Sequence, residues 1–136
     1  MRNLLIIAIL AAVTGCAQTP AETAAAAQAG VATRAALEKE LAGLVPGKPQ
    51  ACLDRFGSQQ LKGFGATVIY KVSGSLKFRS DTAGGCERIA RGDILVTRSY
   101  SGRLCRGDIG QTIDPVSRFP TGSCSFSDFV PYRKAS

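Results

Sequence analysis

Residues 67–80 read TVIYKVSGSLKFRS, and the spacing of their apolar side chains decides the fold class. Large apolar residues fall at every second position on both sides of a turn at Gly74, which is the period of an extended strand with one buried face. A short turn between two such segments predicts a β-hairpin. The residues that form the expected buried face are Val68, Tyr70, Val72, Leu76 and Phe78.

Similar short segments follow the hairpin at spacings of about ten residues, which favours an antiparallel β fold. Residues 93–100 (DILVTRSY) and 109–114 predict further strands, with a turn at Ser101-Gly102 between them. The tail SFSDFVPY offers Phe126, Phe129 and Tyr132 as a closing lid or an edge strand. We therefore expect a mainly β domain, a small antiparallel sheet forming a sandwich or partial barrel, with one short N-terminal helix and two disulfides.

The short helix is predicted on the N-terminal side of the strands. Leu37, Leu41 and Leu44 recur at helical spacing between Ala32 and Gly43, and Pro46-Gly47 ends the pattern. We assign residues 36–49 to this helix and a linker, with a frayed segment as the alternative. The preceding residues 16–35 are rich in alanine and contain no aromatic side chain, so they are expected to form a flexible tether.

The first sixteen residues, MRNLLIIAILAAVTGC, have the organisation of an export signal. Arg2 precedes an apolar run, Leu4–Val13, that is about ten residues long and too short to span a bilayer. The ending VTGC resembles the signal of bacterial lipoproteins, in which the cysteine is acylated and becomes the new N-terminus. The resemblance implies cleavage after residue 15 and lipid attachment at Cys16, and the alternative is an ordinary secretory signal.

A lipoprotein with three acyl chains, palmitate among them, would be held firmly on a membrane. Ala17 follows Cys16, where an aspartate often signals retention in the inner membrane of enterobacteria. We expect a bacterial envelope protein of the outer membrane that faces the periplasm, although the sorting rule differs between species.

Four cysteines remain beyond Cys16, and an even number in an exported chain predicts two disulfides. Three pairings are possible. We prefer one local bridge and one that ties the ends of the domain, which gives Cys86–Cys105 and Cys52–Cys124.

The amino-acid composition excludes several classes of catalytic and metal-binding site. The chain has no histidine, which excludes Ser-His-Asp and Cys-His catalysis and histidine-containing zinc sites. No CxxC, phosphate-binding or dinucleotide-binding motif occurs, so we expect no cofactor and no metal. An enzyme would have to work through Asp, Arg, Ser or Tyr, for example by pairing Asp108 with Asp114 or Asp128. We therefore predict a protein that is not an enzyme.

The charge is +7, and it is +6 without Arg2 of the signal. Six arginines fall within about thirty residues, and such a cluster suits phosphate and carboxylate groups. We predict binding of an anionic envelope polymer or lipid rather than nucleic acid, and the alternative is a solvated face that keeps the protein soluble. The candidate anion-binding residues are Arg79, Arg88, Arg91, Arg98, Arg103 and Arg106.

The tripeptide RGD occurs at residues 91–93 and again at residues 106–108. It is an adhesion motif in some proteins, but glycine and aspartate are also common in turns. Each copy directly precedes an isoleucine, Ile94 or Ile109, so we interpret both as turns that enter strands.

Several short motifs resemble a family of small proteobacterial exported proteins and lipoproteins whose function is uncharacterised. They are Cys52-Leu53, Gly84-Gly85-Cys86, LCRGD at 104–108, GSC at 122–124 and FVPY at 129–132. The resemblance covers residues 50–132 and implies a four-cysteine β-rich domain followed by a short tail, residues 133–136. It implies no catalytic residue.

Together these features predict a non-enzymatic envelope lipoprotein that binds an anionic envelope component. The alternative is an inhibitor of a host or bacterial hydrolase, because Ser73-Gly74-Ser75 resembles the inhibitory loop of small lysozyme-inhibitor lipoproteins. The positive charge opposes binding to lysozymes that are themselves basic. The sequence does not give the oligomeric state.

Overall fold

The computed structural model describes residues 18–54, 60–99 and 101–135. Residues 1–15 of the expected signal, the expected lipid attachment site Cys16, and Tyr100 of the expected third strand lie outside the described residues. The elements, in chain order, are α1 (Pro20–Leu41), β1 (Leu44–Pro46), β2 (Cys52–Leu53), β3 (Gln60–Phe64), β4 (Thr67–Lys71), β5 (Leu76–Asp81), the 3-10 helix η1 (Glu87–Arg91), β6 (Ile94–Thr97), β7 (Leu104–Cys105), β8 (Ile109–Ile113), β9 (Pro120–Ser125) and β10 (Val130–Lys134).

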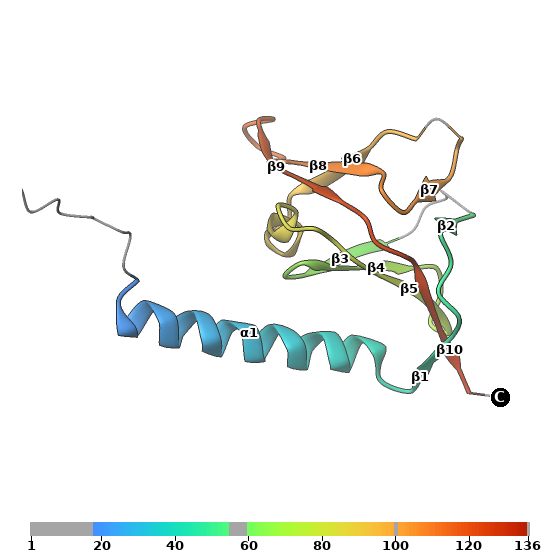
Figure 1. Cartoon of the computed structure of the whole chain (residues 1–136), viewed down its shortest axis with the longest axis horizontal. Helices are drawn as coiled ribbons and strands as arrows, with labels where there is room; N and C mark the ends of the chain where they lie inside the picture. The colour runs from blue at the N-terminus through green and yellow to red at the C-terminus, as the bar shows by residue number, and fades with distance from the viewer. Residues whose placement is uncertain (1–17, 55–59, 100, 136) are drawn as a thin grey trace, which may run out of the picture.

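The described strands form three antiparallel sheets, which confirms the expected mainly β fold class (Figure 1). The largest sheet has the order β1-β10-β5-β4-β3, the second has the order β6-β8-β9, and β2 pairs with β7 in a short ribbon. Helix α1 lies along the side of the five-stranded sheet that faces away from the three-stranded sheet. The layers are therefore helix, five-stranded sheet and three-stranded sheet.

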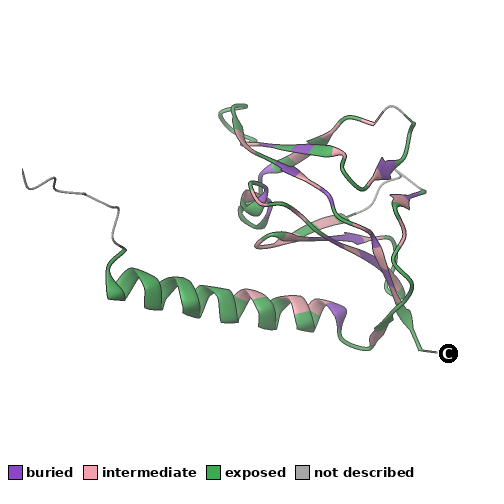
Figure 2. Ribbon diagram, viewed as in Figure 1, coloured by how far each residue is buried: buried purple, intermediate pink, exposed green. Residues whose placement is uncertain are grey.

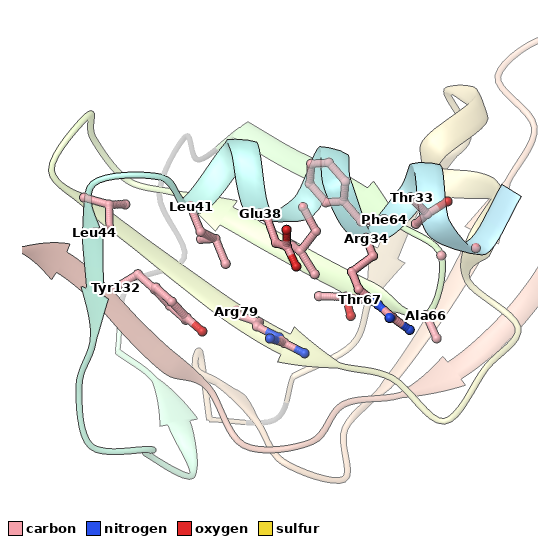
Figure 3. A pocket seen from close by; sticks show the side chains of 13 residues that line it. Thr33, Arg34, Glu38, Leu41, Leu44, Phe64, Ala66, Thr67, Arg79 and Tyr132 are labelled. Atoms are coloured by element: carbon pink, nitrogen blue, oxygen red, sulfur yellow. The ribbon is translucent and has the colours of Figure 1, made fainter. Parts of the chain in front are cut away.

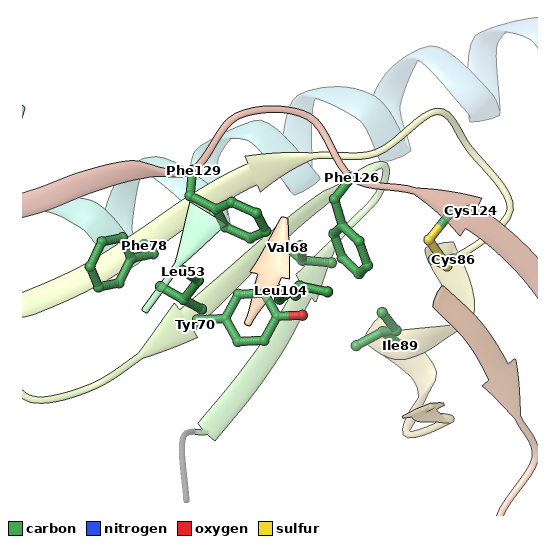
Figure 4. Close-up of a cluster of buried hydrophobic side chains, with 10 residues drawn as sticks. All are labelled: Leu53, Val68, Tyr70, Phe78, Cys86, Ile89, Leu104, Cys124, Phe126 and Phe129. Atoms are coloured by element: carbon green, nitrogen blue, oxygen red, sulfur yellow. A yellow bond between two sulfur atoms is a disulfide. The ribbon is translucent and has the colours of Figure 1, made fainter. Parts of the chain in front are cut away.

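The main core lies between the sheets (Figure 4). The hairpin of β4 and β5 supplies Val68, Tyr70 and Phe78, as its alternating pattern predicts, and Leu76 packs against them. The prediction for Val72 is wrong, because this residue follows the end of β4 and is 44% exposed. Apolar side chains from the β2–β7 ribbon, from η1 and from the C-terminal segment complete the cluster. These are Leu53, Leu104, Ile89, Phe126 and Phe129, and they are at most 8% exposed.

Helix α1 begins at Pro20, well before the short helix expected from the leucine spacing. The expected flexible tether, residues 16–35, is therefore helical from Pro20 onward. Thr19 and Glu22 form a reciprocal capping box, with each backbone N–H bonded to the other's side chain, and Pro20 occupies the first helical position. Together with the high helix propensity of alanine, these contacts start the helix early.

Only the C-terminal part of α1 is packed against the sheet (Figure 2). Every described residue from Thr19 to Ala32 is exposed, whereas Thr33 and Leu37 are partly covered and Leu41 is buried. Ile69, on the side of β4 opposite Val68, is completely buried. Leu37 and Leu41 therefore dock the helix, whereas Leu44, expected to continue the helical pattern, belongs to β1. The first half of α1 projects beyond the β domain.

The four domain cysteines form two disulfides, but the preferred pairing is wrong. The bridges are Cys52–Cys105 and Cys86–Cys124, instead of Cys86–Cys105 and Cys52–Cys124. Cys52 and Cys105 lie directly opposite each other in the β2–β7 ribbon, and this pairing decides the partner of Cys105. The pairing of strands in the fold, and not a short separation in the sequence, therefore determines the partner of Cys105.

The C-terminal segment is neither a lid nor an edge strand. Strand β10 lies between β1 and β5, and its outer neighbour is the three-residue strand β1. Phe126 and Phe129 are 3% and 0% exposed, so this segment is part of the central core. Strand β1 was missed because a three-residue segment ending in proline has no visible period.

Candidate binding surfaces

The outer side of the three-stranded sheet carries exposed apolar side chains. Along β6 and β8, alternate residues point away from the core, and Ile94, Val96 and Ile109 are 50%, 41% and 56% exposed. Ile94 pairs with Ile113, and Val96 pairs with Gln111, so these side chains are neighbours on one surface. We call this surface the outer apolar face; it consists of Ile94, Val96, Ile109, Gln111 and Ile113.

The inner side of the same strands is packed against the core, so the outer apolar face is the side that is left facing solvent. Leu95, Gly110 and Thr112 point inward, and Leu95 packs against the main core. A side chain on Gly110 would collide with Leu95 and Phe126, so the inner side of β8 is already filled to contact. Neighbouring exposed apolar side chains on one side of a sheet form a candidate interaction surface.

A shallow hollow of about 560 Å³ lies on the outer apolar face and has charged groups beside it. Arg98, which directly follows β6, lines it together with Val96 and Ile109. Within the described residues Arg98 makes no ion pair. Asp108 also lines the hollow, but its Oδ2 accepts the backbone N–H of Cys105 at 2.7 Å. The hollow thus combines an apolar floor with the charged side chains of Arg98 and Asp108.

A second candidate is the groove of about 720 Å³ between α1 and the five-stranded sheet (Figure 3). Leu41 and Leu44 lie at one end of this groove, and the guanidinium groups of Arg34 and Arg79 extend toward Thr67 at the other. Sequence reasoning missed this groove, because it depends on how α1 crosses the sheet.

The charges around the groove are balanced. Arg79 donates to both carboxylate oxygens of Asp81 at 3.1–3.2 Å, and Thr67 donates to the same carboxylate at 2.6 Å. Glu38 of the helix also lines the groove and offsets the charge of Arg34. The groove therefore has no excess of positive charge with which to attract an anion.

The six clustered arginines do not share one face. Arg79 lines the groove beside α1, Arg88 and Arg91 belong to η1, Arg98 lines the hollow, and Arg103 and Arg106 flank β7. Four of them are paired with carboxylates. The pairs are Arg79–Asp81, Arg88–Asp93, Arg103–Asp54 and Arg106–Asp128.

The Arg88–Asp93 pair belongs to a polar network behind the three-stranded sheet. Arg88 Nε lies 2.9 Å from Asp93 Oδ2, Thr121 donates to the same oxygen, and the hydroxyls of Thr121 and Thr112 are 2.9 Å apart. The Thr121 hydrogen bond and the Arg88 guanidinium lower the pKa of Asp93. This aspartate is 8% exposed, so it stabilises the fold and is not available to a ligand.

Both RGD tripeptides form turns that lead into strands, as interpreted from the sequence. Gly92 ends η1 with φ 99° and Gly107 has φ 87°, and these are conformations that favour glycine. Asp93 is bonded to Arg88, and Asp108 caps its own turn through the Cys105 N–H. Strands β6 and β8 begin at the next residue in each case.

The other features singled out in the sequence have separate surroundings. Asp108 and Asp114 lie at opposite ends of β8, and Asp128 is paired with Arg106, so the structure shows no catalytic carboxylate pair among these three. In residues 18–54, 60–99 and 101–135, no cluster of three Cys, Asp or Glu side chains is arranged to hold a metal. Ser73 and Ser75 lie in the exposed β4–β5 turn, with their hydroxyls 3.2 Å apart.

None of the helices in the described part of the chain has the length and apolarity needed to cross a membrane. Comparison of the chain with family models, curated proteins and solved structures finds no match in any of the three.

Proposed function

We propose that this chain is a non-enzymatic, lipid-anchored protein of the bacterial envelope, related to the exported four-cysteine family that it resembles. Cys16 carries the anchor, α1 connects the anchor to the β domain, and the two disulfides stabilise a small β domain outside the cytoplasm. A helix of 22 residues spans about 33 Å at 1.5 Å per residue.

We further propose that the outer apolar face binds an acidic lipid or another acylated anionic component of the envelope. The observation that carries this proposal is the set of three half-exposed branched side chains, Ile94, Val96 and Ile109, beside Arg98, which forms no ion pair with any described residue. Acyl chains would cover the apolar groups, and Arg98 would pair with phosphate or carboxylate. The excess of positive charge on the whole chain favours the approach of such ligands.

The binding proposal is tested by titrating the full chain, purified in a neutral detergent, with soluble short-chain phosphatidylglycerol. We expect the Val96→Ser/Ile109→Ser double variant to bind about tenfold more weakly, because losing two partly buried apolar side chains costs about 1–2 kcal/mol. Arg98→Gln should reduce the preference for phosphatidylglycerol over phosphatidylcholine.

The matched control is Val45→Ser/Val72→Ser, which removes two similarly exposed valines from the five-stranded sheet and the β4–β5 turn. Equal losses in the two double variants would overturn the outer apolar face as the binding site. The anchor is tested separately, by mass spectrometry of the N-terminal peptide and by labelling with palmitate. A chain that incorporates no fatty acid would overturn the lipoprotein proposal.

A further inference from the structure

The turn between β8 and β9, residues 114–119, carries the most exposed large apolar side chains of the described residues. Val116 is 90% exposed and Phe119 is 72% exposed, with Arg118 between them in the chain. The turn continues from the outer apolar face but extends past the end of the sheet. Side chains this open gain little from the fold, and two of them on one short turn make it a candidate contact surface.

The turn is held rigidly by Asp114. Its carboxylate accepts the backbone N–H groups of Val116 and Ser117 at 2.9 and 2.8 Å, and its carbonyl accepts the N–H of Arg118 at 2.9 Å. The N–H of Asp114 in turn donates to the carbonyl of Phe119 at 3.0 Å.

Arg118 has φ 63°, and within the described ranges it is the one residue other than glycine with a positive φ. Backbone strain of this kind persists where the surrounding contacts fix it, and it is concentrated at functional sites. The hydrogen bonds to Asp114 therefore fix the turn in a conformation that leaves both apolar side chains exposed. A preformed apolar tip binds without the entropic cost of ordering a loop.

The position of the turn suits a membrane contact. In Figure 1 the β8–β9 turn lies at the upper left of the β domain, above the middle of α1, and the first turn of α1 lies farther to the left. Cys16 precedes Pro20 by four residues, which reach at most about 14 Å when extended. A bilayer that holds Cys16 is therefore close to the start of α1, and a tilt of the domain brings the turn to its surface.

We propose that the β8–β9 turn inserts Val116 and Phe119 into the interfacial layer of the bilayer to which Cys16 is attached, while Arg118 contacts acidic headgroups. This inference rests on the lipid anchor of the proposed function and adds a second, non-covalent membrane contact. A bilayer fits better than a protein partner, because segments that anchor proteins at a membrane surface combine aromatic and aliphatic side chains with basic ones. Phe119, Val116 and Arg118 provide this combination, and Arg118 forms no ion pair with any described residue.

The chain contains no tryptophan, so a single introduced tryptophan reports its own surroundings. The full-length Phe119→Trp variant is reconstituted into vesicles of phosphatidylethanolamine and phosphatidylglycerol whose acyl chains are brominated. We expect the emission of this variant to shift to shorter wavelength and to be quenched about twofold. The control is Val72→Trp, an exposed apolar position in the β4–β5 turn, which should show neither change.

Adding Val116→Ser and Arg118→Gln to the Phe119→Trp variant should abolish the quenching. Emission from position 119 that matches the Val72→Trp control would overturn the inference, and this is also the result expected if a protein covers the turn. Mass spectrometry of the same samples keeps the two proposals apart. An acylated N-terminus without quenching overturns the turn contact alone, whereas quenching of a chain that carries no acyl group supports the turn contact and overturns the anchor.

Discussion

Glu40, in the last turn of α1, and Lys77, in β5, form an ion pair in which both side chains are nearly buried. Lys77 Nζ lies 2.7 Å from Glu40 Oε1 and also donates to the Glu40 backbone carbonyl. Lys62 of β3 binds the second carboxylate oxygen at 2.7 Å. The Glu40 and Lys77 side chains are only 13% and 11% exposed, so this contact fixes the end of the helix to the sheet.

Lys77→Met should loosen α1 without unfolding the β domain. The variant leaves a nearly buried carboxylate with Lys62 alone, and we expect a loss of about 2 kcal/mol, less than the 3–5 kcal/mol of a fully buried pair. Hydrogen exchange should rise in residues 33–41 and change little in β4. The control is Glu38→Gln, an exposed position on the same helix. Equal exchange in the two variants would show that Leu37 and Leu41 alone hold the helix.

Acid should destabilise the domain steadily, because three carboxylates of the β domain and the packed end of α1 have a lowered pKa, as does Glu22 in the capping box of α1. Lys62 and Lys77 lower the pKa of Glu40, Thr121 and Arg88 lower that of Asp93, and the Ser117 and Val116 N–H groups lower that of Asp114. A lowered pKa in the folded state means that the unfolded chain binds more protons. Stability is then fully present above about pH 5 and falls as the pH drops through the folded pKa values.

Urea denaturation between pH 6 and pH 2 measures this loss. Lys77→Met removes one of the groups that lower the pKa of Glu40, so its curve should fall less steeply than that of the unchanged chain. A midpoint that stays constant down to pH 3 would contradict the assignment of these three carboxylates as stabilising groups.

The strands whose apolar residues alternate were predictable from the sequence, because one buried face imposes a period of two. The hairpin of β4 and β5 follows this rule. Ile69 departs from it, since α1 covers the second face of β4 and buries this residue as well. The length of α1 depended on the capping box at Thr19 and Glu22, a signal that is present in the sequence but weaker than the leucine spacing.

The binding surfaces were less predictable than the fold. The six arginines lie close together in the sequence, but the fold places them on different elements. Aspartates form ion pairs with four of them. The outer apolar face could not be predicted from the sequence, because the apolar residues Ile94 and Val96 are of the type that usually forms the core side of a strand. Only the packing of Leu95 on the inner side shows which face of β6 is open.

Gly85 and Gly122 are predicted to be intolerant of any side chain. A Cβ atom on Gly122 would collide with the carbonyl of Gly85, and one on Gly85 would collide with the carbonyl of Ser123. Because backbone atoms cannot move aside easily, Gly122→Ala should cost about 2–4 kcal/mol, the range of severe single substitutions. Thermal unfolding measures the loss. Gly74→Ala, in an open turn with no atom near its Cβ, is the control and should change stability by less than about 1 kcal/mol. Equal effects at Gly74 and Gly122 would contradict the close packing of β9 against Gly85.

Tyr70→Phe should leave stability unchanged or raise it by up to about 1 kcal/mol. The Tyr70 hydroxyl is buried in the core and has no hydrogen-bond partner among the described residues, and burial raises the pKa of this group. Removing the hydroxyl avoids its desolvation and keeps the ring against Phe129. Urea denaturation at pH 7 tests this, and a loss above 1 kcal/mol would show that the hydroxyl has a partner outside those residues.

The two disulfides should differ in how easily they are reduced. Cys86 and Cys124 are 1% and 4% exposed within the core, whereas Cys52 and Cys105 are both partly exposed in the β2–β7 ribbon. Thiol–disulfide exchange needs access to a sulfur atom, so low concentrations of a reducing agent should open Cys52–Cys105 first.

Alkylation with a mass label after partial reduction, followed by peptide mapping, identifies which cysteines have become free. Removing both Cys86 and Cys124 should destabilise the domain by about 2–4 kcal/mol through the unfolded chain, with a further loss because both sulfur atoms belong to the core. Removing Cys52 and Cys105 should not cause the additional loss of core packing. The Cys52–Cys105 bridge does, however, close a longer loop, with a sequence separation of 53 residues against 38 for Cys86–Cys124. If the bridge between Cys86 and Cys124 opened first, or the two opened together, access would not control reduction, and the packing of Cys124 against the core would need revision.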